Sequence, residues 1–203
     1  LGFTKFSLHP AMSFITAPGV GISIWLALKT GLIATVLSLL CCFIILIGLM
    51  HDRRFSLLRR TLAALVAVPH SAIAIGLVFL LAPSGWLIRI LSPGITGFDS
   101  PPDWSLVPDP YGWVLIFGLM AKEIPFLLMV SLAAIATLPV RQFEQIANSL
   151  GYGRVAAWAT LILPLIYRQI RLPVFAVLVF SLSVVDMALL MAPTLPPPLA
   201  ILV

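Results

Sequence analysis

The amino-acid sequence predicts an all-α protein, a polytopic bundle of transmembrane helices. Of its 203 residues, 61% are hydrophobic and only 9% are charged, and the mean hydropathy is +1.15. A soluble domain cannot bury so large an apolar fraction, so we expect an integral membrane protein. The apolar runs are long and continuous, which is typical of spanning helices and unlike the alternating strands of a membrane barrel.

The placement of charge predicts the orientation of the spans. Two loops are rich in arginine, and the loop between them carries Asp99, Asp103 and Asp109 against Arg89 alone. The arginines are Arg53, Arg54, Arg59 and Arg60 in the first loop and Arg141, Arg154, Arg168 and Arg171 in the second. Because positive loops mark the cytoplasmic face, we expect both to be cytoplasmic and the acidic loop to lie outside. The net charge of +5 then needs no nucleic acid as a partner.

After an outer-face connection in residues 1–20, the first span is expected at 21–50. Its length exceeds the ~20 residues that cross a bilayer, so its start should lie along the interface or project beyond it. Lys29 can extend from there toward the headgroups. Cys41 and Cys42 are neighbours within this span, and we expect both thiols to behave as small hydrophobes, not as metal ligands.

The second span is expected at 57–81 and contains Pro69 followed by His70. Proline inside a membrane helix frees backbone groups that neighbouring helices must satisfy, so we expect a kink packed within the bundle. His70 is expected to be a satisfied histidine that faces the bundle, with a role as ligand or proton carrier as the alternative.

An outer loop is expected at 83–110, with a short surface helix near Trp86. Its aromatic residues and those that follow, Trp86, Trp104, Tyr111 and Trp113, are typical of an interfacial belt. The loop is either a solvated connection or a surface that meets an external binding protein.

The third span, at 111–138, places Lys122 and Glu123 near the middle of the membrane, since Lys122 lies ~14–17 Å beyond Tyr111 along a helix. Charges at that depth should face the bundle or a wet cavity. Neighbouring residues point ~100° apart around a helix, so the two cannot satisfy each other and each needs another partner.

The fourth span is expected at 165–190 and carries Asp186, a candidate partner for Lys122. Ser181 and Ser183 on the same span could line a polar path, but we favour hydrogen bonds to their own helix. Together with His70, Lys122 and Glu123, Asp186 forms the candidate translocation path.

Between the third and fourth spans, residues 141–153 predict a short helix at a membrane face. Phe143, Ile146, Ala147 and Leu150 recur at i, i+3, i+4 and i+7 and therefore share one side. Gly151 and Gly153 should end this helix, because glycine adopts a left-handed conformation without steric cost. Periodicity alone allows two interpretations, a helix that docks a soluble partner or one that lies in the headgroups.

The spacing within this stretch favours the docking helix. The pattern Gln145-Ile146-Ala147-(x)3-Gly151, followed by Leu163-Pro164, closely resembles the Glu-Ala-Ala loop of binding-protein-dependent ABC importer permeases. In one departure, Gln145 stands at the family's acidic position and Glu144 comes one residue earlier.

The resemblance implies a MetI-like transmembrane permease domain, multi-pass in a bacterial inner membrane, whose loop helix plugs into a cytoplasmic ATPase subunit. Phe143, Ile146, Ala147 and Leu150 would fill the ATPase groove, Glu144 and Gln145 would make polar contacts at its edge, and Gly151 would set the exit angle. It also implies an ATPase dimer that holds ATP and Mg²⁺, a second permease half and an extracytoplasmic solute-binding protein. The weaker likeness of Lys122-Glu123-Ile124-Pro125-Phe126 points to the thiamine and ferric-iron branch, which often fuses two permease halves.

The chain itself carries no ATPase signature, since none of its lysines, Lys5, Lys29 and Lys122, follows a glycine as a phosphate-cradling loop requires. We therefore expect a transport subunit and not an enzyme. The chain has no initiating methionine and ends in apolar sequence, so we expect a fragment with about four spans.

Two other functions remain open from the sequence. An ion-coupled carrier would use Lys122, Glu123 and Asp186 as membrane-embedded titratable groups. An intramembrane serine hydrolase, the more remote alternative, would use the Gly-x-Ser pattern that ends at Ser23, with His70 as the base.

Overall fold

The computed structural model describes residues 14, 16–50, 54–103, 107, 109–195 and 197–202. Regular structure in this part of the chain is entirely helical, which confirms the predicted all-α class. Arg53, Trp104 and most of the expected outer connection at 1–20 lie outside the described residues. Four helical stretches are long and apolar enough to cross a membrane, at Val20–Leu49, His70–Leu91, Trp113–Ala136 and Arg154–Ser183.

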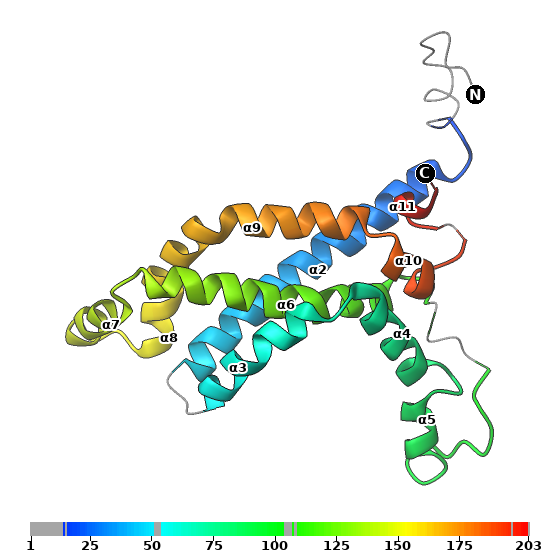
Figure 1. The fold of residues 1–203 in the computed structure, drawn as a ribbon, viewed down its shortest axis with the longest axis horizontal. Coiled ribbons are helices and arrows are strands. Elements are labelled where there is room, and N and C mark those ends of the chain that lie inside the picture. Colours follow the sequence, from blue (N-terminus) through cyan, green and yellow to red (C-terminus); the bar gives the residue numbers. More distant parts are fainter. Residues whose placement is uncertain are drawn as a thin grey trace.

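Three long helices form the centre of the bundle. Helices α6 (Trp113–Ala136) and α9 (Leu163–Ser183) run side by side, and α2 (Val20–Leu49) crosses and contacts both (Figure 1). The buried face of α2 is rich in small residues spaced about one turn apart, namely Ser23, Ala27, Gly31, Ala34 and Ser38. Small residues let membrane helices approach closely. At Gly31 an added Cβ would lie 2.8 Å from Leu182 Cδ2 of α9, so that position is filled by the neighbouring helix.

The opposite face of α2 is exposed and apolar, as a membrane-facing surface requires. It consists of Ile22, Trp25, Leu28, Leu32, Val36, Leu40 and Ile44, each at least 48% exposed. The spacing of three or four residues gathers these side chains into one stripe.

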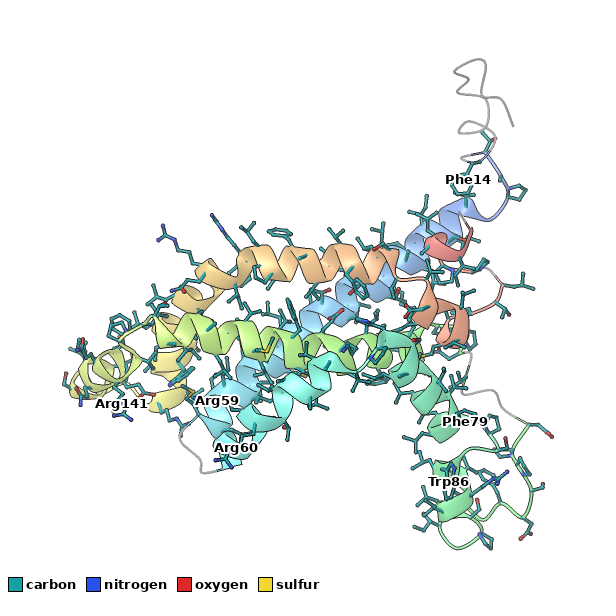
Figure 2. The ribbon with its side chains drawn as sticks, in the orientation of Figure 1. Phe14, Arg59, Arg60, Phe79, Trp86 and Arg141 are labelled. Atoms are coloured by element: carbon teal, nitrogen blue, oxygen red, sulfur yellow. The ribbon has the colours of Figure 1, made fainter. Side chains whose placement is uncertain are left out.

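In place of one span over 57–81, the structure has α3 (Arg54–Ala67) and α4 (His70–Leu81), separated at Val68 and Pro69. Proline lacks an amide hydrogen and disfavours helical backbone in the preceding residue, so the expected kink becomes a break. Beyond it, α4 and the short α5 (Trp86–Leu91) project away from the three central helices, as the positions of Phe79 and Trp86 show (Figure 2).

The expected span at 165–190 is also interrupted. Helix α9 ends at Ser183, and after an interruption at Val184 and Val185 a short α10 (Asp186–Met191) packs on α4 and α6. The last helix, α11 (Leu199–Leu202), packs on α2.

Lys29 is anchored where α6 begins. Its Nζ donates a hydrogen bond of 3.0 Å to the carbonyl oxygen of Tyr111 and lies 5.7 Å from the ring centre of Trp113. Cations lie favourably over aromatic rings, so this contact fastens α2 to the start of α6.

Candidate functional site

The two arginine-rich loops lie at the same end of the bundle. Arg59, Arg60 and Arg141 are found together at that end (Figure 2). The Nη2 of Arg154 donates a hydrogen bond to the carbonyl oxygen of Ile47, near the end of α2. This contact ties the second loop to the end of α2, just before the first loop in the sequence, and agrees with the expected placement of both on one face.

The second loop contains three helical segments. Helix α7 (Val140–Ser149) is followed by α8 (Arg154–Ala157) and by η1, a π-helical turn at Trp158–Ile162 that leads into α9. The predicted helix at 141–153 therefore ends earlier than expected.

Gly151 ends α7 as predicted, with φ of +79°. The amide of Tyr152 donates to the carbonyl of Ala147, and the amide of Gly151 donates to that of Asn148, both at 3.0 Å. This is the Schellman arrangement, which needs a left-handed residue at that position. The left-handed conformation expected of Gly153 is wrong: its φ is −67° and its ψ 159°, and it precedes α8 in extended backbone.

Part of the apolar face of α7 packs against the bundle, and the rest is exposed. Ala147 is buried, and Phe143 is half-buried against the bundle core. Ile146 and Leu150 are 55% and 69% exposed. Two members of the predicted face thus hold α7 to the bundle, while the other two project from it.

Of the two polar residues predicted to contact a partner, one is exposed and the other is bonded within this chain. Gln145 is exposed, whereas the Glu144 carboxylate accepts a 2.6 Å hydrogen bond from the indole Nε1 of Trp158. Trp158 is fully buried and was not singled out from the sequence. The available signal was chemical, since a buried indole N–H needs an acceptor and an acid lies in the same loop.

The π-helical turn follows from Pro164. That residue has no amide hydrogen with which to bond the carbonyl of Thr160, so the regular ladder is interrupted one turn earlier. The amide of Leu163 bonds instead to the carbonyl of Trp158, five residues back. The Leu163-Pro164 pair thus sets the geometry with which the loop enters α9.

In the membrane-embedded part, Lys122 is satisfied by the break between α3 and α4. Its Nζ donates to the carbonyl oxygens of Leu65, Val66 and Val68 at 3.3, 2.7 and 2.6 Å. These three bonds match the three donors of an ammonium group. Within the described structure these carbonyls, and not Asp186, are the partners of Lys122.

Glu123 is bonded across helices. It is only 4% exposed, and its Oε1 accepts a hydrogen bond from Ser181 of α9. Among the described residues its Oε2 has no hydrogen-bond partner. As expected, Ser181 and Ser183 also bond to their own helix, to the carbonyls of Val177 and Val179 at 2.9 Å.

Three of the four candidate path residues line one cavity of about 220 Å³ between α3, α4, α6 and α9. It is bounded by Val66, His70, Lys122, Glu123, Phe126, Ala176, Val177 and Phe180. The His70 ring lies 4.5 Å from the Phe180 ring, centre to centre. Asp186 is exposed at the start of α10 and does not line this cavity.

The structure does not pair Ser23 with His70. Ser23 is fully buried on α2, and its hydroxyl has no hydrogen-bond partner in the part of the chain that the structure describes. Ser23 is also absent from the cavity that His70 lines.

The fold and these contacts define a class, a multi-pass helical membrane protein with a loop helix braced against one end of its spans. No family model matches the chain. It is 28% identical over 209 residues, covering 96% of this chain, to the inner membrane ABC transporter permease protein YnjC of Escherichia coli strain K12. This chain spans 39% of the length of that relative. The printed name of that relative describes an ABC transporter permease of the inner membrane, and the four apolar helices of this chain agree with a multi-pass location there.

Proposed function

We propose that this chain forms part of the permease of an ATP-driven ABC importer with a MetI-like core. The observation that carries the proposal is α7, a helix closed by Gly151, held to the spans by Phe143 and Ala147, and exposing Ile146 and Leu150 at one end of the bundle. A helix of this kind can insert exposed apolar side chains into a groove of a soluble partner.

The partner in this proposal is a dimer of cytoplasmic ATPase subunits, which binds ATP and Mg²⁺. Ile146 and Leu150 would enter the ATPase groove, and Gln145 would lie at its edge. Closure of the ATPases would move α7, and the attached spans would move with it as rigid bodies. The solute path would then open alternately to the outside and to the cytoplasm. A solute-binding protein outside the cell would deliver the cargo.

The pore would be shared with a second permease half. A relative much longer than this chain supports two halves fused in one protein, as in the thiamine and ferric-iron branch. The cavity bounded by His70, Lys122 and Glu123 is the candidate segment of the solute path within this half.

The test is cysteine crosslinking in the full-length protein with Cys41 and Cys42 replaced by alanine. Ile146→Cys and Leu150→Cys should crosslink to the ATPase subunits in a nucleotide-dependent manner. Ala147→Cys is the matched control, since Ala147 is only 6% exposed and should react poorly. If neither exposed site crosslinks and both are shielded from aqueous thiol reagents, α7 lies in the headgroups and the proposal fails.

The alternative function, an ion-coupled carrier, predicts that transport depends on the proton gradient and not on ATP. Collapse of the proton gradient at constant ATP would stop a carrier and leave an ABC importer running. The three carbonyl bonds of Lys122 already give that residue a structural role, which removes one reason for the carrier.

A further inference from the structure

The acidic residue of α7, Glu144, points into the protein. At the place where the resembled family carries its acid, this chain has the exposed Gln145. The one acid in the sequence of this loop, Glu144, is half-buried and accepts the Trp158 hydrogen bond of 2.6 Å. A carboxylate that receives an N–H bond in a partly buried setting is held more firmly than a surface acid.

Trp158 connects that bond to the spans. Its side chain is fully buried, in one cluster with Leu46 of α2, Leu128 of α6 and Ile166 of α9. It also opens the π-helical turn that continues into α9. Displacement of Glu144 therefore acts on a side chain that belongs to the buried cluster built by all three central helices.

The backbone between α7 and α8 offers a weaker connection. It passes through Gly151 and Gly153, and neither position has another atom within 4 Å of where a Cβ would lie. Because glycine has no side chain, these two positions add no packing contacts to the Schellman bonds that fix Gly151 to the end of α7. The side-chain bond bypasses that segment.

We propose that Glu144 and Trp158 are positioning residues that make α7 and α9 move as one unit, so that the acid serves transmission within this chain and not recognition of the ATPase. This inference rests on the proposed function, because it requires a partner that moves α7. It differs from the expectation that Glu144 lies at the edge of the ATPase groove.

The test uses the full-length transporter with its ATPase subunits in liposomes, Cys41 and Cys42 replaced by alanine, and Ala176→Cys as a reporter. Ala176 is exposed and lines the cavity, so its rate of labelling by an aqueous maleimide follows water access. The measured quantity is the change in that rate when ATP, Mg²⁺ and vanadate are added.

Glu144→Ala and Trp158→Phe should each reduce this change about tenfold, which is the scale of one charge-assisted hydrogen bond. The double variant should lose no more than either single variant, because both remove the same bond. Glu144→Gln should retain most of the response, since an amide oxygen still accepts from the indole. Trp113→Phe, at the far end of α6, is the matched control and should respond normally.

Three results would overturn the inference: a full response in Glu144→Ala, losses that multiply in the double variant, or a Glu144→Gln variant as impaired as Glu144→Ala. The last would mean that a partner senses the charge itself. Crosslinking from Leu150→Cys in otherwise unaltered protein separates the two levels. Absence of this crosslink, with Leu150→Cys shielded from aqueous thiol reagents, defeats the proposed function. Its presence, with a full Ala176→Cys labelling response in Glu144→Ala, defeats only the role of the pair.

Discussion

The Nζ of Lys122 lies 2.6 Å from the carbonyl oxygen of Val68, the residue just before the proline that separates α3 from α4. Two more carbonyls of the same helix end, those of Leu65 and Val66, accept from the same ammonium group. Pro69 cannot donate to Leu65, so that carbonyl has lost its helical partner. A cation at a helix C-terminus is also favoured by the helix dipole. Lys122 thus holds the end of a broken membrane helix.

Lys122→Met should lower the free energy of unfolding by about 2–4 kcal/mol, because it leaves three partly buried carbonyls without their donor. The measurement is the thermal unfolding midpoint of the purified protein in detergent. Lys29→Met is the control, since Lys29 makes one hydrogen bond, to the carbonyl of Tyr111, and a ring contact with Trp113, at an exposed site. It should cost about 1 kcal/mol or less. Equal losses of unfolding free energy in the two variants would show that the three bonds of Lys122 stabilise the fold no more than the contacts of Lys29 do.

Pro69→Ala provides a rescue of the Lys122→Met variant. Alanine restores an amide at position 69 that can donate to the carbonyl of Leu65, so the double variant should be more stable than Lys122→Met alone. A further loss on adding Pro69→Ala would contradict the view that the proline creates the demand for Lys122.

Gly112 combines left-handed backbone with crowding. Its φ is +77°, and an added Cβ would lie 2.7 Å from Cγ2 of Thr30. Thr30 is 1% exposed and its hydroxyl bonds to the carbonyl of Leu26 at 2.9 Å, so its side chain cannot move aside easily. Gly97, with φ of +69° and open space around it, is a matched position that has only the backbone constraint.

Gly97→Ala should cost about 1–2 kcal/mol from backbone strain, and Gly112→Ala should cost more because the clash is added. Adding Thr30→Ser to Gly112→Ala removes the clashing methyl group while it keeps the hydroxyl. Unfolding midpoints should then return toward that of Gly97→Ala. A midpoint unchanged by Thr30→Ser would show that packing against α2 is not the source of the difference.

Local chemistry allowed several of these features to be predicted from the sequence. Pro69 predicted a kink where the structure has a full break, because proline acts on its own helix, and Gly151 predicted the end of α7 because glycine readily adopts the left-handed conformation. Apolar content was sufficient for the helical class.

Long-range partners could not be predicted in the same way. The carbonyls that bind Lys122 lie 54 to 57 residues away, and they become acceptors only because a distant helix breaks. Periodicity placed Phe143 and Leu150 on one side of α7 but could not say that the bundle covers one and leaves the other exposed. The interruption at Val184 and Val185 carried no glycine or proline to signal it.

Ser181 and Ser183 test the interhelical role of Glu123. Both hydroxyls bond to their own helix, but only Ser181, which is 5% exposed, also reaches Glu123. Ser181→Ala should lower the free energy of unfolding by about 1–3 kcal/mol, since a buried carboxylate loses a donor. Ser183→Ala should stay within about 0.5 kcal/mol of the unaltered protein. Unfolding in detergent measures both, and an equal effect of the two substitutions would argue against a bond between α6 and α9.

Gly151→Val tests the direction in which α7 leaves the bundle. A β-branched residue at φ of +79° is strained by about 1–2 kcal/mol or more, so the Schellman end should rearrange and tilt α7. Gly153→Val is the matched control two residues away, because its φ of −67° suits any residue and no atom lies within 4 Å of the new Cβ. Gly151→Val should still assemble with the ATPase subunits, as measured by co-purification, but should uncouple transport from ATP hydrolysis and lose the ATP-dependent change in Ala176→Cys labelling. Gly153→Val should keep that change. Normal labelling in Gly151→Val would mean that the angle set by this glycine does not matter for coupling.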